Sequence, residues 1–233
     1  MEEVTKTLLI QPDIFIGGLR IAEPVTTLTG LLVALFSFFA WWRLGQTASQ
    51  NPINVHLRWF FLLMAIGTAI GGIVGHAFLY MLPYYWKLPG WTISMLSITA
   101  IERAAIFQAN PLLRPFWTRF FLWGTLIEFV VFLLLVGFTQ NFKWVELQAG
   151  IGLLVVMGML QTYIYQKTRC QGSLILLASI PVAVLAVLPH VFKFSPSVWF
   201  THFDIGHLFM CAAVWVLWRG AEGIKGSLEP VKM

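Results

Sequence analysis

Seven long apolar runs divide this chain, and they limit its possible folds more than any other feature. An α-helix needs about 20 mostly apolar residues to cross the hydrocarbon core of a bilayer. Only 11% of the residues are charged, whereas soluble domains typically have about 25%. We therefore expect an all-α integral membrane protein that forms a single seven-transmembrane helix bundle over residues 1–233, with six spans as the main alternative. The expected spans are about 25–42, 59–82, 92–108, 116–138, 145–165, 174–188 and 198–218.

The basic residues predict the orientation of this bundle. Of the 15 Lys and Arg residues, nine fall on one side of the predicted spans and five on the other. Basic loops stay preferentially in the cytoplasm, so we expect the C-terminus to be cytoplasmic and the N-terminus to be outside. The expected location is a plasma membrane or a bacterial inner membrane. The net charge of +5 is explained by this asymmetry and requires no nucleic-acid partner.

Ionisable residues mark the start of the last predicted span, where His202, Asp204 and His207 fall within a few residues of one another. Charged groups in hydrocarbon cost at least about 2.5 kcal/mol each, so they usually face a protein interior or bind a ligand. His76 and His190 lie near the outer ends of the second and sixth runs. At a rise of about 1.5 Å per residue, four of the five histidines then fall in the outer half of the membrane.

These histidines are candidate metal ligands. Neutral imidazole suits zinc, copper and iron, and a catalytic zinc needs three protein ligands and an open position. We expect His76, His202 and His207 to be the ligands, with His190 as a substitute. Positions five apart on a helix point about 140° apart, so we expect a bulge or unwinding at Gly206. The alternative is that these are structural histidines held by hydrogen bonds.

Three acidic residues occur at membrane depth. Asp204 and His207 are three positions apart and share a helix face, so Asp204 can be a ligand itself or an acceptor that fixes the tautomer of a histidine. Glu102 falls near mid-membrane and can line the same cavity. For Glu128, we favour an ion pair with Arg103 of the neighbouring helix.

Other polar and small residues are expected to serve helix packing. Gln148 and Gln161 can join helices by hydrogen bonds. The run 67–75 contains many small residues, which permit close packing of helices. It would also let a neighbouring backbone or a lipid chain approach His76.

Three of these segments resemble the seven-span hydrolase superfamily of alkaline ceramidases and adiponectin-type receptors. Residues 21–31, Ile-Ala-Glu-Pro-Val-Thr-Thr-Leu-Thr-Gly-Leu, resemble the first-helix segment of the ceramidases, and Gly-Gly-Ile-Val-Gly-His at 71–76 resembles their second-helix motif Gly-x-Gly-Ser-x-x-Phe-His. His202 and His207 resemble the histidine pair of their seventh helix. The expected topology is also that of the ceramidase branch.

The resemblance implies a zinc ion held by His76, His202 and His207, and hydrolysis of a lipid amide bond. The chain departs from the family at Gly72, where the family has a serine, and it lacks the family's aspartate after the second-helix histidine. The resemblance therefore implies that Asp204 or Glu102 supplies the catalytic acid–base group.

Three functions stay open at this point. The first is a zinc-dependent intramembrane hydrolase that acts on a membrane lipid, with zinc lowering the pKa of its bound water toward about 7 and Asp204 or Glu102 moving the proton. The second is a haem-binding electron-transfer protein with His76 and either His207 or His190 as axial ligands. The third is a non-enzymatic receptor or a subunit of a larger assembly with membrane-protein partners.

Overall fold

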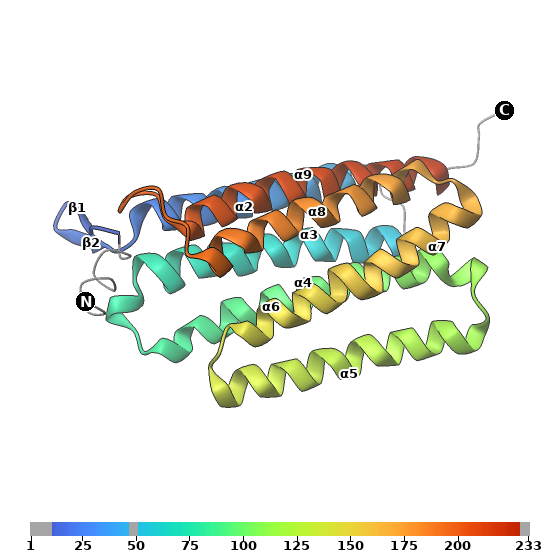
Figure 1. Ribbon diagram of the computed structural model, residues 1–233, viewed down its shortest axis with the longest axis horizontal. Coiled ribbons are helices and arrows are strands. Elements are labelled where there is room, and N and C mark those ends of the chain that lie inside the picture. The colour runs from blue at the N-terminus through green and yellow to red at the C-terminus, as the bar shows by residue number, and fades with distance from the viewer. Residues whose placement is uncertain (1–10, 47–50, 229–233) are drawn as a thin grey trace.

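The computed structural model describes residues 11–46 and 51–228 of the chain. Within them, seven long helical rods form a bundle with a short β-hairpin at one end (Figure 1). The rods are α2 (Pro24–Gly45), α3 (Pro52–Ile70) continued by the π-helix η1 (Gly71–Ala77), α4 (Leu88–Ala109), α5 (Pro115–Thr139), α6 (Lys143–Gly150) continued by the π-helix η5 (Ile151–Met157) and α7 (Gly158–Thr168), α8 (Gln171–Phe192) and α9 (His202–Leu228). The hairpin strands are β1 (Ile14–Ile16) and β2 (Leu19–Ile21), and the short 3₁₀ helices are η2 (Leu79–Met81), η3 (Tyr84–Lys87) and η4 (Asn110–Leu112).

Five helical segments of the described residues are long and apolar enough to cross a membrane: α2, α3 with η1, α5, α6 with η5 and α7, and α8. The all-α class is therefore confirmed, and these segments indicate a membrane protein. The helices α4 and α9 are 22 and 27 residues long but do not reach the same apolarity. Seven crossings stay a prediction.

The second rod spans 52–77, whereas the apolar run predicted a span at 59–82. Its start is set by capping and not by apolarity. The side chain of Asn51 accepts a hydrogen bond from the backbone N–H of Ile53 at 2.9 Å, as a helix N-cap does. Pro52 then occupies the first helical position, where its missing N–H costs nothing.

The last rod also begins later than predicted, at His202. The carboxylate of Asp204 accepts hydrogen bonds from the backbone N–H and the hydroxyl of Thr201. This is a capping-box arrangement, in which a side chain of the first turn reaches back to the residue that precedes the helix. Local hydrogen bonds therefore decide where the apolar helix starts.

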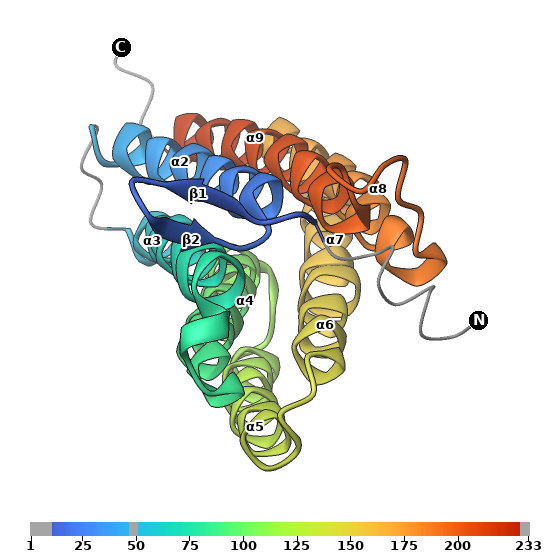
Figure 2. The ribbon, with the colours of Figure 1, turned by 90° about the vertical axis from the view of Figure 1, so that its left-hand side faces the viewer.

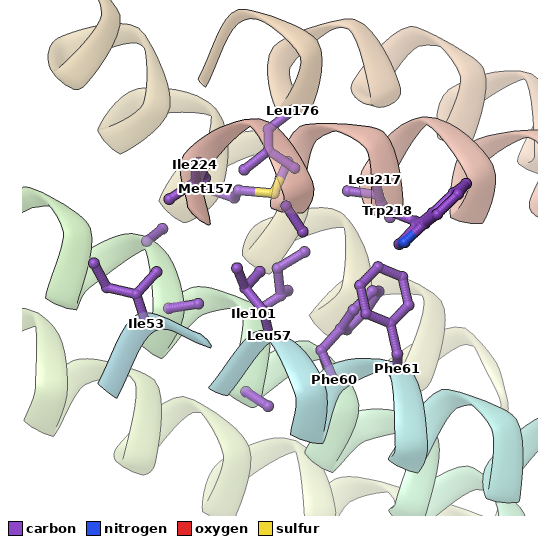
Figure 3. Packing of buried hydrophobic residues seen from close by; sticks show 14 of the residues in the cluster. Ile53, Leu57, Phe60, Phe61, Ile101, Met157, Leu176, Leu217, Trp218 and Ile224 are labelled. Carbon is purple, nitrogen blue, oxygen red and sulfur yellow. The ribbon is translucent and has the colours of Figure 1, made fainter. Parts of the chain in front are cut away.

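The main apolar core lies where α2, α3, α4, η5, α7, α8 and α9 meet, and Figure 3 shows part of it. Phe60, Phe61, Ile101 and Met157 are almost completely buried there. Lipid is as apolar as these side chains, so close packing and hydrogen bonds between helices stabilise the bundle more than hydrophobicity does.

Two amide side chains supply such hydrogen bonds, as predicted. Gln161 donates through Nε2 to Oε1 of Gln108 at 2.9 Å, and Gln148 donates to the carbonyl oxygen of Met95 at 3.5 Å. Both bonds link α4 to the rod formed by α6, η5 and α7. The helix α5 contacts α4 and α6 and lies at the edge of the bundle (Figures 1 and 2).

The β-hairpin crosses the end of the bundle in front of α2 and α3 (Figure 2). Gly17 and Gly18 have positive φ angles of 58° and 85°, as the tightest hairpin turns require. The backbone N–H of Ala22 donates to the carbonyl oxygen of Ala77 at 3.1 Å. This bond attaches the hairpin to the end of η1.

Candidate functional site

The hairpin end of the bundle gathers four of the five histidines. His76 comes from η1, His190 from the last turn of α8, and His202 and His207 from the first turns of α9. The ring centroids of His76 and His207 are 6.3 Å apart, and those of His190 and His202 are 5.3 Å apart. The grouping that helix depth predicted is therefore present, but as two pairs.

The ring of Phe203 lies beside both pairs. Its centroid lies 5.6 Å from that of His76, 5.0 Å from that of His190 and 4.3 Å from that of His202. Phe203 therefore contacts histidine rings of both pairs. Its role was not predictable, because an aromatic residue in an apolar run carries no distinguishing signal.

The predicted bulge at Gly206 is wrong, because α9 is a regular α-helix from His202 onward. His202 and His207 therefore point to different sides of it. The glycine serves helix packing instead. A β-carbon at Gly206 would lie 2.8 Å from Nε2 of His190 and 3.0 Å from the carbonyl oxygen of Ala186, so glycine is what lets α8 approach α9 at this point.

His76 is held by Glu23, a residue to which the sequence analysis gave no role. The carboxylate of Glu23 pairs with Nδ1 of His76. Glu23 precedes α2 in the left-handed conformation, with φ 42°, which is uncommon for a residue other than glycine. His76 itself lies in a π-helical segment, and such segments occur frequently at functional sites. The Ala-Glu match to the ceramidase segment was the signal that could have identified Glu23.

Lys87, at the end of η3, adds a positive charge beside Glu23. Burial raises the pKa of the Glu23 carboxyl, but the hydrogen bond with His76 and the neighbouring positive charges outweigh burial, and the pKa lies below its ordinary value. Burial also lowers the pKa of the Lys87 ammonium, and the charge of Glu23 opposes that effect in part. Glu23, His76 and Lys87 are therefore electrostatically coupled at this end of the bundle.

His207 is held on the opposite side by Thr29 of α2. Oγ1 of Thr29 lies 2.9 Å from Nδ1 of His207 and 3.3 Å from Oδ1 of Asp204. The hydroxyl also lies 3.1 Å from the carbonyl oxygen of Thr26, so it can donate its one proton either there or to the carboxylate, and it can accept the Nδ1–H of the imidazole. Asp204 and His207 therefore share a helix face, as predicted, and Thr29 connects them.

Asp204 is completely buried and surrounded by hydrogen-bond donors. In addition to Thr29 and Thr201, Gln11 donates to Oδ2 of Asp204 through Nε2 at 2.7 Å. The amide oxygen of Gln11 accepts from the backbone N–H groups of Val25 and Thr26 at 3.0 and 3.3 Å, which are unpaired within the first turn of a helix. Gln11 thus connects the starts of α2 and α9.

Two glycines lie where α2 and η1 approach each other, and the tighter contact is at Gly72. A β-carbon at Gly30 would lie 3.5 Å from Cε1 of His207 and 3.6 Å from Cα of Gly72, and a β-carbon at Gly72 would lie 3.2 Å from the carbonyl oxygen of Thr27. The prediction that the small-residue run serves close helix packing is confirmed. The departure from the ceramidase serine at Gly72 lies at this contact.

A family model matches residues 25–225, which is most of the chain. The chain belongs to DUF6962, a family of unknown function. No curated protein and no solved structure matches it. The DUF6962 match includes His76, Asp204 and His207, whereas Gln11 and Glu23 precede it.

The histidines of this DUF6962 protein fit a metal ion in part. Among the residues that the structure describes, no three His, Cys, Asp or Glu side chains are placed to hold one together. However, His76 and His207 each engage an oxygen through Nδ1, and within the part of the chain that the structure describes Nε2 of neither ring has a hydrogen-bond partner. Metal-bound histidines are typically held in this way.

The structure does not place Glu102 in this cluster. It follows Lys87 by 15 positions along α4, which corresponds to roughly 22 Å at 1.5 Å per residue. The expected ion pair between Arg103 and Glu128 is not formed either, because the carboxyl group of Glu128 faces Glu102 instead. The position of each residue along its helix could be predicted from the sequence. The face of the helix on which its side chain lies could not.

Proposed function

We propose that this protein is a zinc-dependent intramembrane hydrolase that cleaves an amide bond of a membrane lipid. One observation carries the proposal: His76 and His207 come from different rods, lie 6.3 Å apart between ring centroids, and each engage a side-chain oxygen through Nδ1. Such fixed imidazoles with a free Nε2 are suited to bind zinc. The amide substrate is inferred from the resemblance to ceramidases.

The proposal needs a third ligand, and two histidines are candidates. His190 acts electrostatically on both His76 and His207, and its Nε2 lies against the backbone of Gly206. Nε2 of His202 is buried and has no hydrogen-bond partner among the described residues, but His202 is not among the charged groups that act on His207. We therefore favour His190.

The chain's own carboxylates would then have separate roles. When bound, zinc would polarise the amide carbonyl and activate a water molecule. Asp204 has its oxygens engaged by several donors, so it would be a positioning residue that orients His207 through Thr29. Glu23 is partly exposed beside His76 and would be the group that accepts and returns the proton.

The membrane topology proposed here has seven crossings, with the N-terminus outside. The helices α4 and α9 would cross as well, because their acidic residues Glu102 and Asp204 are completely buried inside the bundle and are not exposed to lipid. The histidine cluster would then lie in the outer half of a plasma membrane or bacterial inner membrane, where a lipid can reach it.

Elemental analysis of the purified protein tests the proposal. We expect about one zinc per chain in the wild type, and a loss of zinc in His76→Ala and His207→Ala. His56→Ala is the matched control, because His56 lies in the first turn of α3 and bonds the carbonyl oxygen of Pro52 at 2.8 Å. Protein that is folded and free of zinc after expression in zinc-supplemented medium would contradict the proposal.

Activity and spectroscopy complete the test. Hydrolysis of a long-chain N-acyl lipid should require zinc and should be lost with either histidine. A visible spectrum of the same preparation decides the haem alternative, since a Soret band would indicate haem. Zinc-loaded protein that hydrolyses no acyl amide would favour the receptor or subunit alternative.

A further inference from the structure

Two carboxyl groups face each other inside the bundle, away from the histidine cluster. Glu102 of α4 is completely buried, and neither of its carboxylate oxygens accepts a hydrogen bond from a donor in residues 11–46 or 51–228. Glu128 lies opposite it on α5, the candidate span with the smallest buried share of the five. An unpaired charge at such a position is strongly unfavourable, so the orphaned oxygens of Glu102 indicate that something neutralises it.

The second π-helix borders this pair. A β-carbon at Gly152 of η5 would lie 3.0 Å from Oε1 of Glu102, so glycine leaves just enough room for the carboxyl group. The segment Ile151–Met157 contains no titratable side chain. Its π-helical turns are of the rare kind that occurs frequently at functional sites.

The charges around Glu102 do not balance if both carboxyl groups are ionised. The charged groups that act on Glu102 are Glu128 from α5 and Arg103 from its own helix. Two adjacent carboxylates in a site of low polarity do not both ionise readily, and one guanidinium can compensate one negative charge. We propose that Glu102 and Glu128 share one proton at neutral pH and form a proton-binding site between α4 and α5.

A proton fits this place better than a metal cation does. Calcium takes about six to eight oxygen ligands, and magnesium requires about six in octahedral geometry. The neighbours of Glu102 are instead Ile98 and Gly152, whose carbon atoms line the contact, and the positive charge of Arg103 repels a cation. A proton needs no more than the two carboxyl groups themselves.

The shared proton would also join two helices. With the proton present, one carboxyl group donates a hydrogen bond to the other across the contact between α4 and α5. Without it, two like charges repel each other in a medium that screens them poorly. Proton release would therefore weaken the attachment of α5, which contacts few other rods.

Chemical labelling with dicyclohexylcarbodiimide tests the site. A protonated carboxyl group adds across one C=N bond of this apolar reagent, and the acyl group then migrates to nitrogen, so the whole reagent is retained and nothing leaves. We expect a mass adduct on Glu102 or Glu128 of the intact protein in detergent at neutral pH, and less labelling as the pH rises. Glu222, which pairs with Arg219 at 3.1 Å, is the internal control that stays unlabelled.

Two variants separate a shared proton from ordinary burial. In Glu102→Gln, Glu128 has no second carboxyl group with which to share a proton, so labelling of Glu128 at neutral pH should be lost. In Glu146→Gln, made at an acidic residue of α6, labelling of the pair should be unchanged. Labelling at acidic pH but not at neutral pH would show that the reagent reaches an ionised pair, and this result would overturn the proposal.

Infrared spectroscopy covers the case in which the reagent does not reach the pair. The difference spectrum between wild type and Glu102→Gln at neutral pH should contain the C=O stretch of a protonated carboxylic acid. If the wild type shows carboxylate bands in its place, no proton is shared and the proposal is overturned. Neither readout depends on zinc or on lipid hydrolysis, so the proton site and the hydrolase can fail separately.

Discussion

The hydroxyl group of Thr29 lies 2.9 Å from Nδ1 of His207, across the contact between α2 and α9. The same oxygen lies 3.3 Å from a carboxylate oxygen of Asp204. Carboxylate, hydroxyl and imidazole thus form a chain that fixes one ring from two helices. In the proposed zinc site, this chain would make Asp204 an orienting residue rather than a direct ligand, and replacement of its middle member, Thr29, tests that role.

Replacement of Thr29 by valine should weaken zinc binding by about 10- to 100-fold, as loss of a ligand's supporting hydrogen bond typically does. Valine keeps the shape of threonine but cannot hydrogen-bond to His207 or Asp204. Competition titration with a zinc chelator measures the affinity. Thr27→Val is the matched control, because the buried Oγ1 of Thr27 has no hydrogen-bond partner. Equal zinc affinities in the two variants would contradict the orienting role.

Removal of the Gln11 side chain should destabilise the fold by about 1–3 kcal/mol, because buried partners would lose their hydrogen bonds. These partners are the carboxylate of Asp204 and two backbone N–H groups at the start of α2. Reversible unfolding of Gln11→Ala in detergent gives the difference in free energy. Gln166→Ala, at an exposed position of α7, should change it little. If Gln11→Ala left the free energy of unfolding unchanged, the connection between α2 and α9 would not contribute to stability.

Substitution of Gly206 by alanine should cost about 1–3 kcal/mol, the usual range for overpacking. The added β-carbon would lie 2.8 Å from Nε2 of His190 and 3.0 Å from the carbonyl oxygen of Ala186. Gly124→Ala in α5 should instead stabilise slightly, because its β-carbon would meet nothing within 4 Å and alanine favours the helix. Thermal unfolding compares the two variants. If the two substitutions change the melting temperature equally, α8 and α9 do not approach each other as closely as described.

The pairing of Glu23 with His76 should make stability depend on pH in the acidic range. Burial opposes ionisation of Glu23, but the hydrogen bond with His76 and nearby positive charges lower its pKa below the ordinary 4.5. A carboxyl group with a lowered folded-state pKa stabilises the fold above its unfolded-state pKa, and this contribution is lost as the pH falls through the folded-state value. The wild type should therefore be more stable than Glu23→Gln at neutral pH, and the difference should shrink below about pH 4.5.

A series of unfolding measurements between neutral pH and pH 3 provides this comparison. Asp13→Asn is a suitable control, because Asp13 pairs with Arg20 in the hairpin at 2.6 Å and lies outside the histidine cluster. A wild-type advantage over Glu23→Gln that is constant throughout the series would mean that the charge of Glu23 is not what stabilises the pair.

The part of this site that sequence could predict is the part set by depth along a rod. The positions of His76 and His207 in the runs were enough to place them at one end. The side on which a residue lies was harder to predict, because apolar residues cover every face of a membrane helix and leave little periodicity to interpret. Glu102 shows the result, since its expected depth suggested that it lines the histidine cluster, whereas its carboxyl group lies against Gly152 of η5.

Two other features of the structure could not be predicted from the sequence, for different reasons. Gln11 reaches Asp204 across 193 positions, and a single glutamine before a helix carries no sign of such a partner. The π-helical segments η1 and η5 also left no signal, because their composition of glycine and aliphatic residues is equally typical of an α-helix at a close contact between membrane rods.

The π-helical turns of η1 have a genetic consequence. A π-helix closes its hydrogen bonds five residues apart instead of four, so such a segment accommodates one residue more than an α-helix of the same length. Loss of a single codon among those for residues 71–75 would let the segment relax to an α-helix while the residues after the deletion keep their direction, so His76 would still face Glu23. Loss of a codon in the α-helical part of the rod would instead rotate everything after it by about 100° and turn His76 away from Glu23. A one-residue change in chain length is thus tolerated in η1 and not in α3.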